Sequence, residues 1–260
     1  MLNVSMKRIV CILFSLCIGN VLQAQYVKDT VKVKQPFSVA FLSLNGGAGI
    51  PMGKYQTDGC ALTGFNTSIM AASTIDDSVV GCVAKISYGV NNVNQALFQQ
   101  ALNNDNPTYT SNIFYMGSYS YTTMMLGAYF AGRSCRKFGF NIRFLIGYLL
   151  MSTPKVSVSA YNNSTGQAYF NGIDEASTGS VCYSAGVGFT YLVTNHLALF
   201  LDADYLHASP IYYVTQWSEP VNGSYPGTTL EGIKSVTQPF SLCQLTIGIG
   251  FKIPGLHFYN

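Results

Sequence analysis

The chain has 260 residues and a formal net charge of +3, and charged residues make up only 10% of it while aromatic residues make up 13%. Ordinary soluble domains carry about 25% charged residues, so either something other than charge keeps this surface solvated or part of the surface does not face water. The near-neutral charge balance also argues against nucleic acid as a partner, because nucleic-acid-binding domains carry basic patches.

The first 24 residues predict a secretory signal peptide. Lys7 and Arg8 precede an apolar run at residues 9–18, and the small residue Ala24 marks the expected cleavage site. The apolar run is far shorter than the roughly 20 residues that a transmembrane helix needs. Cleavage after Ala24 leaves a mature chain with a net charge of +1, which begins with an expected periplasmic segment at residues 25–36.

Residues 37–253 contain eight alternating or β-rich runs and no sign of a second domain. Each run exceeds the roughly 9 to 11 residues that a tilted strand needs to cross a bilayer. The even count matches single-chain bacterial barrels. The eight runs cover residues 37–50, 62–75, 79–91, 113–131, 138–151, 181–194, 197–216 and 240–253.

The last run shows the alternation most clearly. One face of the predicted strand is bulky and apolar, whereas the other face is small or polar and includes Gly248 and Gly250. Glycine at alternate positions weakens an ordinary strand, so that face is expected to look into a space too narrow for larger side chains. A membrane-spanning barrel requires this division, with apolar residues toward lipid and small or polar residues toward the lumen.

The connections between the runs alternate strictly between short and long. Short connections lie at residues 76–78, 132–137 and 195–196, and long ones lie at residues 51–61, 92–112, 152–180 and 217–239. An up-and-down barrel with short periplasmic turns and long outer loops produces this order. The long connections are rich in turn formers and are therefore expected to be solvated loops. Residues 94–103 could form one short helix with apolar side chains along one side, but a surface turn is the favoured interpretation.

Charged residues are nearly confined to the predicted tail, turns and loops. Of the 23 charged residues in the mature chain, 18 fall there, and the alternation places the other five on the non-apolar face. Those five are Lys85, Arg143, Asp202, Asp204 and Lys252. The first four lie at similar distances from their strand starts, which predicts a buried network in the lumen that fixes the interior. The rival interpretation of these four residues is a path for protons or a solute.

Aromatic residues near the predicted strand ends fit the girdles that flank the lipid-facing band of a barrel. The β-propensity of Tyr and Phe explains them equally well. The set is Tyr88, Tyr115, Phe138, Tyr148, Tyr183, Tyr191, Tyr205, Tyr212, Tyr213, Trp217 and Phe251.

The five cysteines of the mature chain show neither a metal-binding nor a disulfide pattern. Their number is odd and their spacings include no C-x-x-C pair, so they are interpreted as small apolar fillers. They are Cys60, Cys82, Cys135, Cys182 and Cys243.

The chain resembles small outer-membrane β-barrel proteins of the OmpA-type transmembrane and OmpW-like kind, particularly those of Bacteroidetes. The resemblance rests on the L-Q-A that ends the signal peptide, on F-S-V-A-F-L-S-L-N-G-G-A-G-I-P-M-G at residues 37–53, and on L-T-I-G-I-G-F-K-I at residues 245–253. The resemblance implies that the protein is localised in the cell outer membrane and is inserted there by the barrel-assembly machinery. Because a tail at residues 254–260 follows the last strand, the assembly signal is either Phe251 or Phe258.

The predicted fold class is therefore all-β: an eight-stranded antiparallel up-and-down transmembrane β-barrel at residues 37–253. A structural or interaction role with a side-chain-filled lumen is expected, together with outer-membrane lipid as a partner and neither cofactor, metal nor catalytic site. Three alternatives stay open. They are the binding or passage of small hydrophobic molecules, as in OmpW-like barrels, a lipid-modifying enzyme that uses His207 with Ser209, and a soluble secreted barrel.

Overall fold

The computed structural model describes residues 40–74, 79–105, 107–133, 137–166, 168–220 and 229–253. All of these belong to one compact unit that covers residues 37–260. The expected signal peptide, the segment at residues 25–36 and the tail at residues 254–260 lie outside the described residues.

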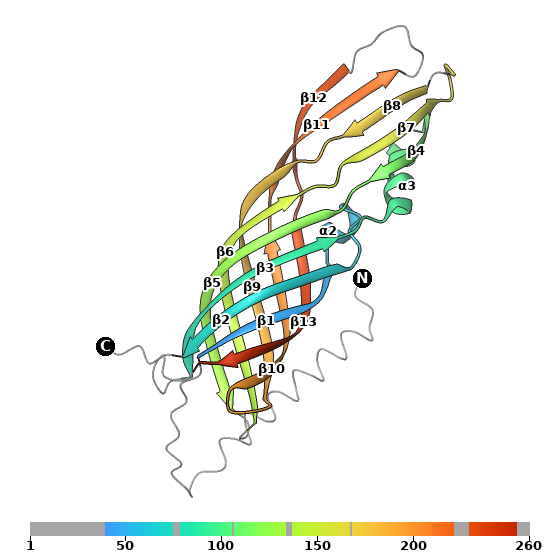
Figure 1. The fold of residues 1–260 in the computed structure, drawn as a ribbon. Coiled ribbons are helices and arrows are strands. Elements are labelled where there is room, and N and C mark those ends of the chain that lie inside the picture. The colour runs from blue at the N-terminus through green and yellow to red at the C-terminus, as the bar shows by residue number, and fades with distance from the viewer. Residues whose placement is uncertain are drawn as a thin grey trace, which may run out of the picture. The chain divides into compact units, whose positions relative to one another are not determined.

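Eight antiparallel strands close into a barrel, which confirms the predicted fold class in its count and its up-and-down order. Around the ring the strands follow the order β1-β13-β10-β9-β6-β5-β3-β2, so the first and last strands pair and close it (Figure 1). The strands are β1 Ala40–Pro51, β2 Gly64–Thr74, β3 Val80–Asn91, β5 Tyr119–Arg133, β6 Phe138–Ser152, β9 Ser177–Leu192, β10 Leu197–Ala208 and β13 Phe240–Lys252.

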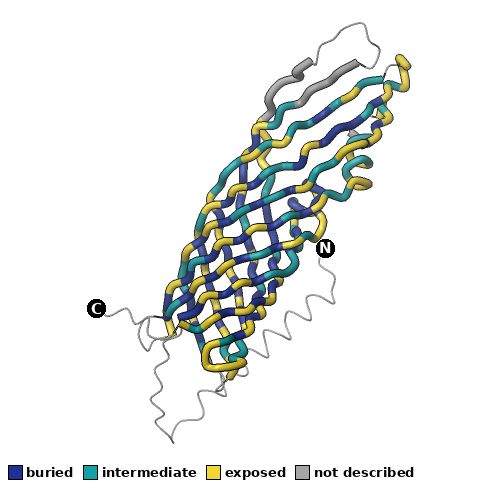
Figure 2. Tube along the Cα trace, viewed as in Figure 1, coloured by how far each residue is buried: buried dark blue, intermediate teal, exposed yellow. Residues whose placement is uncertain are grey.

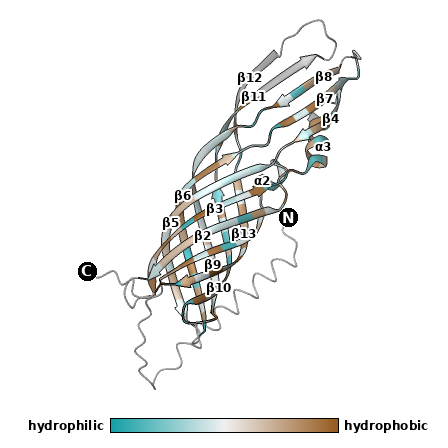
Figure 3. Ribbon diagram, viewed as in Figure 1, coloured by the Kyte–Doolittle hydropathy of each residue, from teal (hydrophilic) through white to brown (hydrophobic). Residues whose placement is uncertain are grey.

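The two faces of each barrel strand differ as the alternation predicts. Outward positions are exposed and mostly apolar, whereas inward positions are buried, and the two classes alternate along the strands (Figures 2 and 3). On β6, Phe144 and Ile146 are exposed while Arg143 and Leu145 are buried. No register shift interrupts the eight barrel pairings between described residues, so the alternation runs unbroken from one end of the barrel to the other.

The predicted long loops are wrong in one respect, because three of the four form regular sheet. Five strands that lie in these connections make an open antiparallel sheet in the order β12-β11-β8-β7-β4. They are β4 Tyr109–Met116, β7 Val156–Asn162, β8 Ala168–Ile173, β11 Ile211–Pro220 and β12 Thr229–Thr237. The predicted runs at residues 113–131 and 197–216 each merged a sheet strand with a barrel strand. Short breaks at residues 117–118 and 209–210 separate them.

Two helices lie in the long connections. The short α2, Lys54–Thr57, sits between β1 and β2. Helix α3, Gln95–Asp105, precedes β4, so residues 94–103 form the helix that the sequence allowed and not the surface turn that was favoured. Phe98 and Leu102 of α3 pack against Ile113, Val156 and Val158 of the sheet. Among the described residues, neither helix has the length and apolar character that crossing a membrane would require.

The barrel therefore has two unlike ends. The chain enters β1 and leaves β13 at the end where the strand connections are short, and there Ile253 N–H donates to the carbonyl of Ala40 over 2.8 Å. The five-stranded sheet and both helices belong to the other end (Figure 1). We call these the short-turn end and the sheet end.

Candidate functional site

The structure brings together the four charged residues that the alternation placed in the lumen. Arg143 donates from Nε and Nη2 to the two carboxylate oxygens of Asp204, over 2.7 and 2.8 Å, and from Nη1 to Asp202 Oδ1 over 2.7 Å. Lys85 Nζ donates to Asp204 Oδ2 over 2.7 Å. Asp204 thus pairs with both Lys85 and Arg143. Its pair with Arg143 has two parallel hydrogen bonds, which is the strongest geometry for an arginine and a carboxylate.

The four residues reach one another from opposite walls of the barrel. Arg143 comes from β6 and both aspartates come from β10, which is separated from β6 only by β9. Lys85 comes from β3, which lies four strands away from β10 in either direction around the ring. The bond between Lys85 and Asp204 therefore crosses the full width of the lumen and ties its two halves together.

Glycines on β9 make room for this arrangement. In the strand register, Gly186 lies between Arg143 and Asp204, and Gly188 lies between Asn141 and Asp202. A Cβ atom added at Gly186 would collide with the Asp204 carboxylate, and one at Gly188 would collide with Asp202. These glycines thus leave space on the lumen face, and the charged side chains of the neighbouring strand occupy that space.

The same explanation holds for the glycines of the last strand. A Cβ at Gly248 would collide with the side chain of Asn45, and one at Gly250 would press on the ring of Phe200 at 2.5 Å. The narrow space that the sequence predicts beside these glycines is therefore filled by the side chains of the adjacent strands.

Two neutral residues complete the network and were missed in the sequence. Gln244 Oε1 accepts a hydrogen bond from Lys85 Nζ over 3.1 Å, and Asn141 Oδ1 accepts one from Arg143 Nη1 over 2.8 Å. Both occupy lumen positions in the strand alternation, so that signal was present. The prediction considered only charged side chains, although buried ions also need neutral hydrogen-bond partners.

The network is buried and electrically balanced. The exposed fraction of Arg143 is 0%, and those of Asp204, Asp202 and Lys85 are 1%, 2% and 4%. Two cations face two carboxylates, so the network itself carries no net charge. Buried ions are tolerated only when they are paired and hydrogen-bonded, as they are here.

Aromatic clusters close the lumen on both sides of the network. Toward the short-turn end, the ring of Phe41 packs against those of Phe200 and Tyr129, with centroid distances of 4.8 and 5.7 Å. Toward the sheet end, Tyr55 of α2 inserts between Phe240 and Tyr119, at 4.7 and 5.3 Å. The exposed fraction of Tyr55 is 0%, and burial raises its pKa well above the ordinary value, so its phenol stays neutral.

The candidate catalytic pair His207 and Ser209 is arranged differently from the hypothesis. His207 Nδ1 lies 2.8 Å from the hydroxyl of Ser241, its cross-strand neighbour on β13. Its ring lies near those of Tyr183 and Tyr205, with centroids 5.2 and 6.4 Å away. His207 lies on the outward face of β10, among the aromatic side chains expected at a membrane interface.

No protein-family model matches this chain, and neither does any curated protein sequence. Among solved structures, the chain is similar to a major outer membrane protein from Thermus thermophilus, with 14% identity and a TM-score of 0.45 over 82% of this chain and 99% of that one. It is similar to Neisserial surface protein A, with 11% identity and a TM-score of 0.41 over 84% and 98% of the two chains. It is also similar to Ail, the attachment invasion locus protein of Yersinia pestis, with 11% identity and a TM-score of 0.39 over 84% and 100%.

Proposed function

We propose that this chain is an outer-membrane β-barrel protein with a sealed lumen, which anchors the five-stranded sheet at the cell surface. The observation that carries the proposal is the outward face of the eight barrel strands, because no Lys, Arg, Asp or Glu with a described side chain occupies an outward position there. Large apolar side chains are instead widely exposed, among them Leu44 at 63%, Leu126 at 66% and Ile247 at 68%. A continuous apolar surface around a whole barrel is unfavourable in water and favourable in lipid.

The height of this surface fits a bilayer. On β6 every outward residue from Phe138 to Leu150 is apolar or aromatic, and the positions between them face inward. Thirteen residues at about 3.3 Å each, tilted by roughly 40°, rise about 30 Å. The apolar band of outer-membrane barrels is about 25 Å tall.

The sealed lumen supports an anchoring role over a transport role. The interior of an eight-stranded barrel is just wide enough to be filled by side chains or to hold one small ligand. Here the ion network fills the middle of the lumen, and aromatic side chains fill the lumen on either side of the network. These features argue against passage of a solute or of small hydrophobic molecules through the barrel interior.

The orientation follows from the two unlike ends. We place the short-turn end toward the periplasm, because a signal-directed chain arrives from that side and the long connections of such barrels face outward. In this orientation the five-stranded sheet faces the medium. Outer-membrane lipid surrounds the band, and the barrel-assembly machinery is the proposed partner during insertion.

The proposal is tested by cell fractionation combined with gel migration of the unboiled protein. We expect recovery in the outer-membrane fraction, and a folded form that migrates differently before and after heating because the closed barrel resists detergent. Recovery in the soluble periplasm or the medium would contradict the membrane assignment. A steady conductance of the purified protein in planar bilayers would contradict only the sealed lumen.

A further inference from the structure

The outward side of the five-stranded sheet continues the lipid-facing side of the barrel. The alternation of β10 continues into β11, so that Tyr205 of β10 and both Ile211 and Tyr213 of β11 are exposed on the outward side. The register pairs Gln216 of β11 with Ile173 of β8, and Ile173 with Val156 of β7. Gln216, Ile173 and Val156 therefore lie on the same side of the sheet as Tyr212. Tyr212 is buried in the same cluster as Tyr55 and Phe240, so the opposite side of the sheet faces outward.

Four exposed aromatic residues gather on that outward side, on the adjacent strands β4, β7 and β8. Their exposed fractions are 60% for Phe114, 54% for Tyr115, 49% for Tyr161 and 39% for Phe170. The rings of Phe114 and Phe170 meet edge to face with centroids 5.9 Å apart. We call these four residues the aromatic patch.

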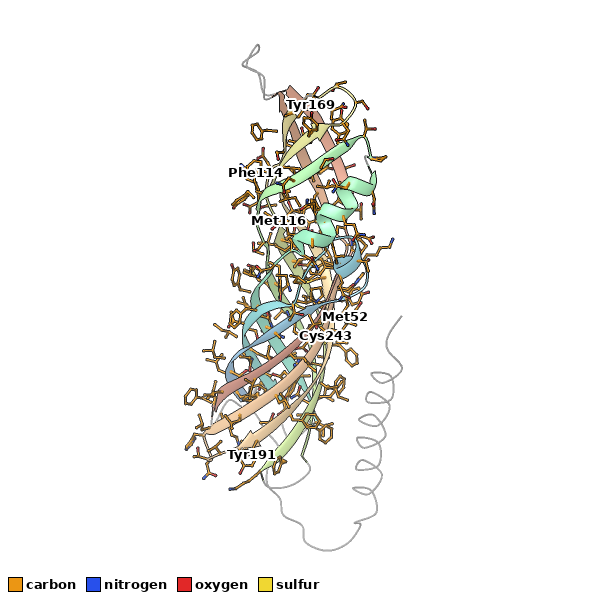
Figure 4. The ribbon with its side chains drawn as sticks, turned by 90° about the vertical axis from the view of Figure 1, so that its right-hand side faces the viewer. Met52, Phe114, Met116, Tyr169, Tyr191 and Cys243 are labelled. Carbon is orange, nitrogen blue, oxygen red and sulfur yellow. The ribbon has the colours of Figure 1, made fainter. Side chains whose placement is uncertain are left out.

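A β-bulge helps to create the patch. The register of β4 against β7 shifts between Ile113 and Tyr115, so that Phe114 is the extra residue. The shift leaves Phe114 and Tyr115 both exposed, although they are consecutive. Figure 4 shows Phe114 and Tyr169 in the sheet, far from Tyr191 near the short-turn end of the barrel. The patch therefore lies beyond the apolar band.

The three strands that carry the patch are uncharged, and charged residues lie at their margins. Glu219 of β11 is opposite Phe170 in the register, and exposed Lys155 and Asp174 form an ion pair just before β7 and just after β8. The 8, 7 and 6 residues of β4, β7 and β8 include no Lys, Arg, Asp or Glu. Ordinary soluble surfaces are about 25–35% charged, so the uncharged middle of this face, on β4, β7 and β8, is unlike a surface that simply meets water. Its polar members are hydroxyl and amide groups such as those of Ser159 and Asn112, which lie opposite each other in the register.

A groove of about 450 Å³ lies on β5, β6 and β9 at the sheet end of the barrel. Ser120, Ser152 and Ser177 form one cross-strand row along it, and the aliphatic side chain of Leu150 lies in the next row toward the band. The hydroxyls of Ser152 and Ser177 lie 2.7 Å apart. From the band toward the sheet end, the outward residues thus change from the row of Leu150 to the row of serines, and the aromatic patch lies beyond them on the sheet.

We propose that the aromatic patch binds the uncharged saccharide headgroup of glycolipids in the leaflet that surrounds the barrel. A sugar ring presents C–H groups on its faces and hydroxyls at its rim. Aromatic faces attract the C–H groups, and neutral amides and hydroxyls pair with the rim. The acyl chains of the same molecule would lie against the apolar band below. This inference rests on the proposed membrane placement.

Native mass spectrometry of the detergent-purified full-length protein tests the inference. The protein is mixed with digalactosyl diacylglycerol and phosphatidylcholine in equal amounts and with the same acyl chains. We expect wild type to retain the galactolipid in about fivefold excess, and Phe114→Ala and Phe170→Ala to retain the two lipids almost equally. Phe251→Ala is the matched control because Phe251 is 61% exposed on the apolar band, and it should keep the wild-type preference.

Three outcomes would overturn the saccharide site. They are equal retention by wild type, an unchanged preference in both patch variants, and a dimer mass that disappears in Phe114→Ala, which would identify the patch as a contact between two copies. Flotation with phosphatidylcholine vesicles separates this failure from that of the proposed function. A wild-type protein that floats but shows no lipid preference contradicts the site alone, whereas one that does not float contradicts both proposals.

Discussion

The barrel and the five-stranded sheet are both antiparallel but solve the problem of strand edges differently. The barrel closes on itself, so each of its strands has two neighbours and no edge is left. The sheet is open, and two of its four pairings contain register shifts. Closure enforces one regular register around the ring, whereas an open sheet tolerates bulges and needs other means to protect its edges.

Helix α3 protects one of those edges. Gln95 and Gln99 donate from their side-chain amides to the carbonyls of Ile113 and Ser111 on β4, each over 3.1 Å. Asn103 Oδ1 accepts from the backbone N–H of Ser111 over 3.0 Å. The three side chains are spaced one helical turn apart, so one face of the helix takes the place of a neighbouring strand.

The largest contrast between the two regions should come from their ion pairs. Asp204→Ala leaves Arg143 and Lys85 buried with only Asp202 to balance them, which is expected to lower the free energy of unfolding by about 3–5 kcal/mol. Asp174→Ala removes the pair with Lys155, whose side chains are 47% and 49% exposed, and should cost about 0–1 kcal/mol. Urea unfolding in detergent measures both. Equal losses in the two variants would show that the network is not a stabilising feature of the barrel.

Two glycines of the barrel should differ in how much stability the same substitution costs. Gly186→Ala forces a Cβ against Asp204, and we expect a loss of about 1–3 kcal/mol. Gly46→Ala meets only the ring of Phe65, at 3.9 Å or more, and should leave the stability unchanged or slightly raised. The temperature at which the folded band disappears on gels compares the two variants. A tolerated Gly186→Ala would contradict the role that we assign to this glycine.

The edge protection of the sheet should be separable from the stability of the barrel. Asn103→Ala removes the acceptor of the Ser111 N–H, which is expected to cost about 1 kcal/mol locally and to speed amide exchange in β4 about fivefold. Asn104→Ala changes a neighbouring exposed side chain of α3 and serves as the control. Hydrogen exchange followed by mass spectrometry reports β4 and the barrel strands together. Faster exchange across the barrel strands would mean that the two regions are not independent.

The smallest effect is expected at the mouth of the barrel. The hydroxyl of Tyr55 is buried without a hydrogen-bond partner among the described residues, so Tyr55→Phe should change the stability at pH 7 by less than about 1 kcal/mol. Because the folded-state pKa of Tyr55 is raised, the neutral phenol favours folding below pH 10, and this contribution is lost as the pH rises further. Unfolding midpoints between pH 8 and 12 should therefore fall less steeply for Tyr55→Phe than for wild type. Parallel curves would contradict this burial.

The sequence predicted the barrel well because its signal is local and repeated. Alternating or β-rich runs located all eight barrel strands, although the alternation was less clear in the first, second and fourth runs. The alternation also placed Lys85, Arg143, Asp202 and Asp204 on one face. Their common depth followed from counting residues from the strand starts. That they meet depends on the closed ring, which brings β3 opposite β10, and on Gly186 and Gly188, whose role appears only when the neighbouring strands are in place.

The sheet was missed because its strands lack that signal. The composition of β7 and β8 is rich in Ser, Asn, Gly and Tyr, which is typical of loops as much as of strands exposed on one side. The breaks that end β4 and β10 are only two residues long, so the neighbouring runs merged into one. Tyr212 was grouped with the interfacial aromatic residues, yet it lies buried at the mouth of the lumen, because it occupies the inward side of β11 between outward Ile211 and Tyr213.

The most direct test of the membrane-embedded, sealed barrel is labelling of single cysteines in intact cells with a membrane-impermeant maleimide, in a variant whose native cysteines are replaced. Ile146→Cys probes the outward face at mid-height, Ser184→Cys probes the lumen, and Ser159→Cys probes the outward side of the sheet. We predict labelling at position 159 alone, because lipid covers position 146 and the filled lumen covers position 184. Labelling at position 146 would contradict the membrane band, and labelling at position 184 would contradict the sealed lumen.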